Sequence, residues 1–172
     1  VRLPQHLDGL DGLILPGGES TTIVHLIDKF ELRDPIIHHI QNGMPTWGTC
    51  AGMIVLAQSM TDDRPTPLGL MGIHVTRNAF GRQVDSFEEY LDIPALGEKP
   101  FRAVFIRAPV VLKVHNGADV MARLGDGRVV AVQQKNMLAT GFHPELTTDS
   151  RFHNYFVQLT TNYQKESECK TG

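Results

Sequence analysis

The segment with the clearest chemical potential is Gly48-Thr49-Cys50-Ala51-Gly52, in which a cysteine stands two residues from a glycine on each side. A strand-like apolar run precedes it and a helix-like run follows. The pattern therefore predicts a nucleophile elbow, a sharp turn that holds Cys50 in a strained backbone conformation above the sheet. The positive end of the helix dipole would favour thiolate over thiol there. The alternative is a buried structural cysteine flanked by packing glycines.

A second segment, His143-Pro144-Glu145, offers what a nucleophilic cysteine needs. Such a cysteine requires a base, and the base requires a group that orients it. Residues i and i+2 of an extended chain point to the same side, so we expect His143 as the base and Glu145 as its orienting carboxylate. The alternative is a strand-end histidine beside a solvated carboxylate, and the presence of the elbow favours the catalytic interpretation.

A third segment, Pro16-Gly17-Gly18-Glu19-Ser20, places two glycines between a strand-like run and a helix-like run. Glycines in this position can turn backbone N–H groups outward, as the tetrahedral oxyanion of acyl transfer requires. We expect Gly17 and Gly18, together with the N–H of Ala51, to form an oxyanion hole. A phosphate-binding loop is the alternative, but neither Gly-Lys-Ser/Thr nor G-x-G-x-x-G is present.

The elements that must position these segments follow from apolar periodicity. Short apolar runs predict strands over 10–15, 45–49, 72–77, 84–93, 102–107, 120–124, 129–133 and 138–142. Helical spacing predicts helices that begin with Ser20 as N-cap and that cover 35–41, 51–60 and 149–163. Asp126-Gly127 is typical of a hairpin turn between two of the strands. Early βα units followed by antiparallel strands indicate a mixed α/β sheet with helices on its faces.

Composition excludes several function classes. The 172 residues are 41% hydrophobic and 20% charged, as in an ordinary globular domain, and the formal net charge is −3. That charge argues against nucleic acid or an anionic membrane as a partner. Only two cysteines occur, Cys50 and Cys169, which indicates a reducing compartment and no disulfide framework. No His, Cys, Asp or Glu group has metal-ligand spacing, so we expect no metal.

Five segments together resemble a known family. They are Pro-Gly-Gly-Glu-Ser-Thr-Thr (16–22), Gly-Thr-Cys-Ala-Gly (48–52), Arg-Asn-Ala-Phe-Gly-Arg-Gln-Val-Asp-Ser-Phe-Glu (77–88), Phe-Ile-Arg-Ala-Pro (105–109) and Phe-His-Pro-Glu-Leu-Thr (142–147). This combination resembles the PdxT/SNO family, the glutaminase subunits of pyridoxal 5′-phosphate synthase, within the class I (triad-type) glutamine amidotransferases. The resemblance covers essentially the whole chain, and the segment 77–88 distinguishes this family within the class.

The resemblance implies hydrolysis of L-glutamine to L-glutamate and ammonia, with the ammonia channelled to a separate synthase subunit of the PdxS/SNZ type in a hetero-oligomeric complex. It implies no cofactor and a cytoplasmic location. Cys50, His143 and Glu145 match the catalytic triad of the family. Its substrate-binding positions are matched by Gly18, Glu19, Ser20, Arg77, Ile106 and Arg107. Physically, an arginine could hold the substrate carboxylate or frame the site. Charge alone does not separate Arg77 and Arg107 from Arg82, and each could instead be a surface ion-pair partner.

The family fold is a three-layer, flavodoxin-like α/β architecture with a mixed central sheet, here a single glutaminase domain over residues 1–172. Family chains begin with a further strand and helix that this sequence lacks, so we expect an N-terminally truncated domain. The missing strand would leave apolar surface and backbone groups exposed at a sheet edge.

Two other functions stay open at this point. One is another enzyme on the same scaffold, such as an amidotransferase of a different pathway or a γ-glutamyl hydrolase, although the segment 77–88 argues against it. The other is a non-catalytic assembly subunit, for which the complete set of triad residues gives no support.

Overall fold

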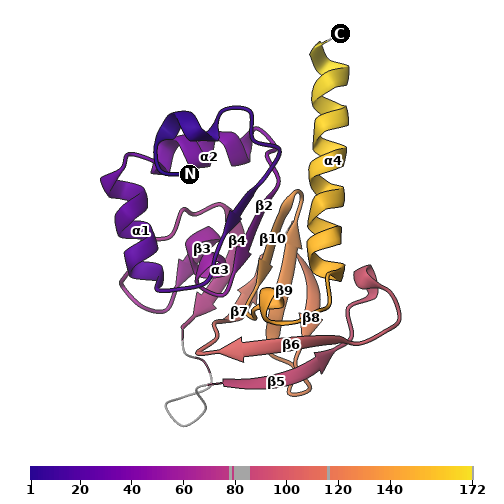
Figure 1. The fold of residues 1–172 in the computed structure, drawn as a ribbon. Coiled ribbons are helices and arrows are strands. Elements are labelled where there is room, and N and C mark those ends of the chain that lie inside the picture. Colours follow the sequence, from indigo (N-terminus) through magenta and orange to yellow (C-terminus); the bar gives the residue numbers. More distant parts are fainter. Residues whose placement is uncertain (78, 80–85, 116, 172) are drawn as a thin grey trace.

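The computed structural model describes residues 1–77, 79, 86–115 and 117–171, with the side chains of residues 166–171 excepted. In this part of the chain, three helices lie on one face of a curled mixed sheet and one long helix lies on the other (Figure 1). The predicted three-layer α/β architecture is thereby confirmed.

The main sheet has the strand order β1-β2-β10-β9-β7-β4-β3, with β8 paired to β9. Its parallel pairs involve β1 (Leu13–Leu15), β2 (Thr46–Thr49) and β10 (Met137–Thr140), and separately β3 (Ala57–Met60) and β4 (Met71–Thr76). Its antiparallel pairs involve β7 (Val110–Val114), β8 (Asp119–Arg123) and β9 (Val129–Gln134). Because β1, β2 and β10 run in parallel, the turns that follow them meet at one edge of the sheet.

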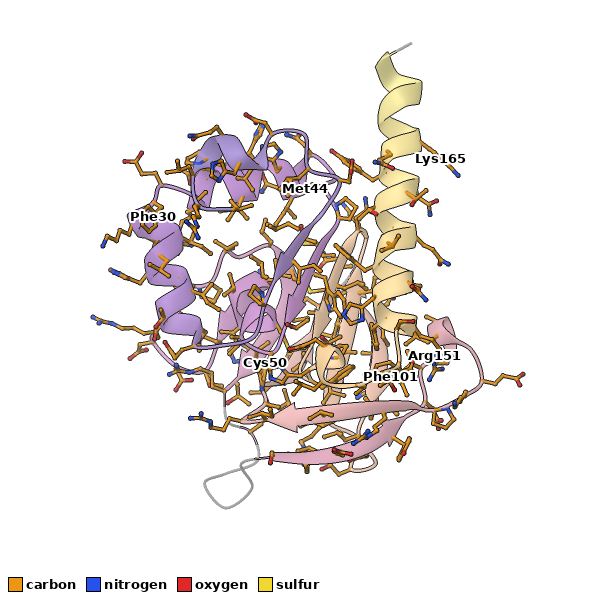
Figure 2. All side chains as sticks on the ribbon, in the orientation of Figure 1. Phe30, Met44, Cys50, Phe101, Arg151 and Lys165 are labelled. Atoms are coloured by element: carbon orange, nitrogen blue, oxygen red, sulfur yellow. The ribbon has the colours of Figure 1, made fainter. Side chains whose placement is uncertain are left out.

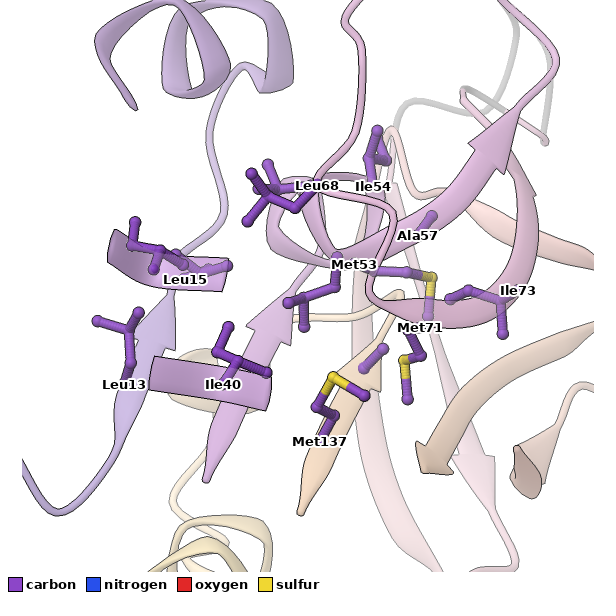
Figure 3. Close-up of a cluster of buried hydrophobic side chains, with 14 of the residues drawn as sticks. Leu13, Leu15, Ile40, Met53, Ile54, Ala57, Leu68, Met71, Ile73 and Met137 are labelled. Carbon is purple, nitrogen blue, oxygen red and sulfur yellow. The ribbon is translucent and has the colours of Figure 1, made fainter. Parts of the chain in front are cut away.

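The two faces of the sheet bury separate apolar cores. On one face lie α1 (Ser20–Lys29), α2 (Arg33–Gln41) and α3 (Ala51–Leu56), and their core includes Met137 and Ala139 (Figure 3). On the other face lies α4 (Arg151–Thr171), whose Phe152 packs in a core with Leu138. Successive residues of a strand point to opposite faces, and for this reason β10 contributes to both cores.

A two-stranded ribbon, β5 (Ser86–Leu91) and β6 (Phe101–Ile106), lies across one end of the main sheet (Figure 1). Phe101 and Phe105 of β6 are buried against Phe142, with ring centroids 5.9 and 5.5 Å away. Three short 3₁₀ helices complete the described elements: η1 (Pro4–Leu7), η2 (Pro94–Leu96) and η3 (Pro144–Leu146).

The predicted helix over 51–60 is wrong in its second half. The helix ends at Leu56, and Ala57–Met60 forms β3, parallel to β4. The residues 68–70 donate their N–H groups to the carbonyls of Val55, Leu56 and Ala57, which are the acceptors that a longer helix would have used. A short apolar run does not by itself separate a buried helix from a buried strand.

Of the remaining features, the predicted hairpin turn is confirmed, whereas one strand and one helix N-cap differ from the predictions. The hairpin turn at Asp126-Gly127 is confirmed, with Gly127 at φ 88° between β8 and β9. The strand β7 was not predicted. Ser20 is not the N-cap of α1, because Glu19 precedes the helix and its carboxylate accepts the N–H of Thr22 at 2.8 Å.

One side of β1 has no partner strand among the described residues, and Ile14 on that strand is 46% exposed. The absence of a first β-α unit stays a prediction. In the described part of the chain, no helix combines the length and apolar composition needed to span a bilayer.

Candidate active site

Cys50 lies at the sharp turn between β2 and α3 (Figure 2). Its backbone has φ 48° and ψ −105°, a region that residues other than glycine rarely adopt. Its N–H donates to the Thr140 carbonyl of β10 at 2.7 Å, and this bond holds the turn against the neighbouring strand. The predicted strained elbow is confirmed, although α3 has only six residues.

The glycines on either side of Cys50 are required by close backbone approach. A Cβ added to Gly48 would overlap the Gly52 carbonyl, and a Cβ added to Gly52 would overlap the Leu15 carbonyl of β1. At both places the overlapping atoms belong to the backbone, so they could not move aside as the end of a flexible side chain could. Both glycines therefore let β1, β2 and α3 meet at the distance that this turn needs.

His143 and Glu145 meet as expected, but through a different backbone. The helix η3 begins directly after His143 and contains Glu145. The pair therefore lies on a short 3₁₀ turn and not on an extended strand. The His143 Nδ1 atom is 2.8 Å from the Glu145 Oε1 atom. The His143 N–H donates to the Val104 carbonyl of β6 at 2.8 Å, which joins this turn to the ribbon. With Nδ1 bound to the carboxylate, Nε2 is left for the thiol of Cys50.

Hydrogen bonding with Cys50 is the largest of the causes that raise the pKa of His143 to about 9; burial opposes it, and the bond to Glu145 adds to it. The ring is 13% exposed. At neutral pH the imidazole therefore carries a proton that it can give to a leaving group.

Cys50 and His143 open onto a cavity of about 370 Å³ at the carboxyl edge of the parallel strands. That volume is in the range of small-molecule sites. The cavity is lined by Gly18, Glu19, Ser20, Cys50, Ala51, Ile54, Arg77, Ile106, Arg107, Pro109 and His143. Every predicted substrate-binding residue is in this set.

The two arginines of the cavity differ in their surroundings. The Arg77 Nε atom is 3.0 Å from Asp62, and its Nη1 atom is 3.8 Å from Glu19. Arg107 has a positive φ of 44° and forms no ion pair with any described residue. The guanidinium of Arg77 thus has acidic partners, and that of Arg107 has none among the described residues. The sequence alone did not indicate this difference.

Some predicted site residues lie elsewhere. Gly17 does not line the cavity, but a Cβ there would come within 2.6 Å of the His143 Cε1 atom. Gly17 therefore borders the imidazole, while Gly18 and Ala51 face the cavity. Arg82 lies outside the described residues, and so does the side chain of Cys169.

Ile54 and Pro109 also line the cavity, and neither was predicted as a site residue. Ile54 could have been found, because it follows Cys50 by one helical turn and so faces the same side of α3. Pro109 ends the segment 105–109, but its type did not mark it as a cavity residue, because its position depends on how β6 leads into β7. Among the described residues, no group of three or more His, Cys, Asp or Glu side chains could hold a metal ion.

The arrangement is suited to acyl transfer. A thiol, an imidazole and a carboxylate are joined in that order at one wall of a cavity, which is the order that nucleophilic catalysis uses. The N–H of Ala51 is the first of α3, so it has no acceptor within that helix and is available to an oxyanion.

Comparisons with known proteins agree with this chemistry. The model of the SNO glutamine amidotransferase family matches residues 1–162. A protein from Herpetosiphon aurantiacus named pyridoxal 5′-phosphate synthase subunit PdxT is 56% identical over 162 residues, which cover 92% of this chain and 85% of that protein. A protein of the same name from Dehalococcoides mccartyi is 54% identical over 166 residues, 95% of this chain and 85% of that protein.

A solved structure described as a glutamine amidotransferase has a similar fold. Its TM-score is 0.88 at 47% sequence identity, and the match covers 94% of this chain and 85% of that one.

Proposed function

Because the chain belongs to the SNO glutamine amidotransferase family, we propose that it hydrolyses L-glutamine to L-glutamate and ammonia for the synthesis of pyridoxal 5′-phosphate. One observation carries the proposal: His143 joins Cys50 to Glu145 at the wall of the cavity. We infer that residues 1–172 act as one glutaminase domain without a cofactor.

The first half of the reaction forms a thioester. The proton of the Cys50 thiol is held by His143 as an imidazolium, and the sulfur attacks the side-chain carboxamide carbon of glutamine. The tetrahedral oxyanion lies against the N–H groups of Gly18 and Ala51, and such donors are each worth roughly 10²–10³ in rate. When the C–N bond breaks, the imidazolium gives its proton to the leaving nitrogen and ammonia departs.

The second half regenerates the enzyme. His143 removes a proton from a water molecule, which attacks the thioester carbon and forms a second tetrahedral oxyanion. The C–S bond then breaks, glutamate leaves, and the proton stays on the imidazolium beside the Cys50 sulfur, as at the start of the reaction. Glu145 fixes the orientation of the ring in both halves and stabilises its charged form.

The rest of the cavity would hold the amino acid end of glutamine. This part carries both a carboxylate and an ammonium group, and the wall offers Glu19 beside Arg77 and Arg107. Arg107 is the guanidinium without an ion-pair partner among the described residues, which leaves it available to the substrate carboxylate. Ser20 and Ile106 complete this side.

The proposed partner is a synthase subunit of the PdxS/SNZ type, which receives the ammonia in a hetero-oligomeric complex. The name of the relatives, a subunit of pyridoxal 5′-phosphate synthase, supports such a partner. We place the complex in the cytoplasm, because a catalytic thiol stays active only where it remains reduced.

The test uses the full protein together with its synthase subunit. Cys50→Ala should abolish glutamate release from glutamine, while Cys169→Ala, which changes the other cysteine, should retain it. An electrophilic glutamine analogue should label the first position only. Glutamate release by the Cys50→Ala complex at the wild-type rate would refute the proposal.

A further inference from the structure

We propose that Asp62 is a positioning residue of the glutaminase site, which holds the guanidinium of Arg77 in place at the cavity wall. Asp62 does not line the cavity itself. It lies in the loop after β3, and its carboxylate is 3.0 Å from the Nε atom of Arg77. This inference rests on the function proposed above and adds a residue that neither motif nor spacing predicted.

The position of Asp62 follows from the pairing of two strands. Met60 at the end of β3 lies beside Val75 of β4, in parallel. The next residue continues this alignment, because the Thr61 N–H donates to the Val75 carbonyl at 3.0 Å and its hydroxyl donates to Thr76 at 3.0 Å. Asp62 is therefore carried to the side of Arg77, which directly follows β4.

The other end of the guanidinium faces Glu19. The Arg77 Nη1 atom is 3.8 Å from the Oε1 atom of Glu19. The second oxygen of Glu19 is already used, because Oε2 accepts the N–H of Thr22 at 2.8 Å and the hydroxyl of Thr21. Glu19 is thus held by the start of α1, and only its Oε1 atom points toward Arg77.

Of these three charged groups, Glu19 is held by neighbouring residues, whereas Arg77 and Asp62 are oriented by contacts with residues distant in the sequence. The side chain of Arg77 is long, and 29% of it is exposed. The bond at Nε to Asp62 leaves the Nη1 atom on the side of Glu19. Without Asp62, the guanidinium would turn toward solvent or approach Glu19 more closely, and both changes alter the wall that meets the substrate.

The predicted consequence is a change in substrate binding with little change in chemistry. In the complex with the synthase subunit, Asp62→Asn should raise the KM for glutamine about three- to tenfold, as expected when a partly exposed ion pair is lost. The kcat should stay within about twofold, because Cys50, His143 and Glu145 are untouched. Asp62→Glu, which restores the carboxylate, should bring the KM back toward the wild-type value.

The neighbouring aspartate provides a matched control. Asp63→Asn makes the same change of charge one residue along the chain, and Asp63 has no hydrogen bond or ion pair with a described residue. It should leave the KM unchanged. In an Arg77→Gln background, Asp62→Asn should have no further effect, because the two residues act through one contact.

The outcomes separate this inference from the proposed function. A wild-type complex without glutaminase activity would overturn both. If the wild type is active, an unchanged KM in Asp62→Asn, or an equal rise in Asp63→Asn, would overturn the role of Asp62 alone. Should Asp62→Asn fail to fold, Asp62→Ser takes its place: a raised KM that the Arg77→Gln background does not raise further would support the role of Asp62. A wild-type KM in a folded Asp62→Ser, or in Arg77→Gln, would overturn it.

Discussion

His143 lies between two groups that act on it in the same direction. Cys50 and Glu145 both raise the pKa of the imidazole, while burial opposes them, and the result is a pKa of about 9. The bond from Nδ1 to Glu145 fixes the orientation of the ring, and both neighbours favour its charged form. A histidine in this setting is protonated at neutral pH, where a free imidazole is mostly neutral, so it is present in the form that can protonate the leaving nitrogen.

Removal of the thiol should lower the pKa of His143. Hydrogen bonding with Cys50 is the largest contribution to the raised pKa, so Cys50→Ala should bring the pKa well below about 9. NMR titration of the imidazole resonances in the two proteins measures the difference. An unchanged pKa would mean that the thiol and the imidazole do not interact.

The same shift makes stability depend on pH. The folded pKa of about 9 exceeds the ordinary value of 6.5, so proton binding by His143 stabilises the folded state. This contribution is fully present below pH 6.5 and is lost as the pH rises through about 9. Urea unfolding of the wild type between pH 6.5 and 9.5 should show a steeper loss of stability than unfolding of Cys50→Ala.

Loss of the orienting carboxylate should impair catalysis without removing the nucleophile. Glu145→Gln keeps the size of the side chain but no longer stabilises the imidazolium or fixes its tautomer. We expect kcat to fall about 10²- to 10⁴-fold in the complex with the synthase subunit. Glu145→Asp should lose less, and a kcat near the wild-type value in Glu145→Gln would show that Glu145 has no role in the reaction.

At the scale of elements, the site depends on how closely β1, β2 and α3 approach one another. The Leu15 carbonyl of β1 lies against Gly52 in the first turn of α3, and Gly48 of β2 lies against the Gly52 carbonyl. Cys50 stands between these contacts. The strained backbone at Cys50 is kept because neither neighbour leaves room for it to relax.

Gly52→Ala should therefore disturb both the fold and the elbow. The new methyl group would overlap a backbone carbonyl, so we expect a loss of about 3 kcal/mol in the free energy of unfolding and a lower kcat. Gly125→Ala is the matched control, because a Cβ there would meet only the end of the Glu89 side chain at 3.5 Å. Chemical denaturation of both variants gives the comparison, and equal stability would contradict the close-packing argument.

The same elements show what sequence could predict and what it could not. Cys50, His143 and Glu145 were found because their types and spacing carry chemistry directly. The strand β3 was missed because an apolar run from Ala51 to Met60 fits a buried helix or a buried strand equally well. Its conformation is decided by β4, which follows it across a polar loop.

Site residues of types that are common throughout the chain were not predicted, for a similar reason. Ile54 and Pro109 line the cavity as apolar residues, and such residues occur throughout the chain. Asp62 is one of several aspartates in the sequence, and only the parallel pairing of β3 with β4 brings it to Arg77. Tertiary contacts, which no local pattern records, select Pro109 and Asp62, whereas the spacing of Ile54 from Cys50 is a local signal that could have been used.

At the scale of the whole molecule, the cavity lies where the main sheet meets the ribbon of β5 and β6. The sheet supplies Cys50, and the segment that follows β6 supplies Arg107. The ribbon also binds the triad turn, through the bond from the His143 N–H to the Val104 carbonyl. The shape of the site therefore depends on how firmly the ribbon is fixed to the rest of the molecule.

Arg151 at the start of α4 provides one such attachment (Figure 2). Its guanidinium donates to the carbonyls of Leu96, Lys99 and Pro100 at 3.3, 2.5 and 3.0 Å, in the segment that connects β5 to β6. It also pairs with Asp149 at 2.6 Å, and it lies 5.6 Å from the centroid of the Phe101 ring. One side chain thus ties α4 to the ribbon through several contacts.

Arg151→Ala should therefore destabilise the protein by about 2 kcal/mol, since hydrogen bonds to a charged group are lost together with ring packing. Arg102→Ala is the control, because Arg102 forms a similar two-bond pair with Glu88 on the exposed side of the ribbon and should cost clearly less. Urea unfolding measures both variants. Equal losses would mean that the ribbon is held by its apolar face alone, and that the connection between β5 and β6 contributes nothing to the position of Arg107.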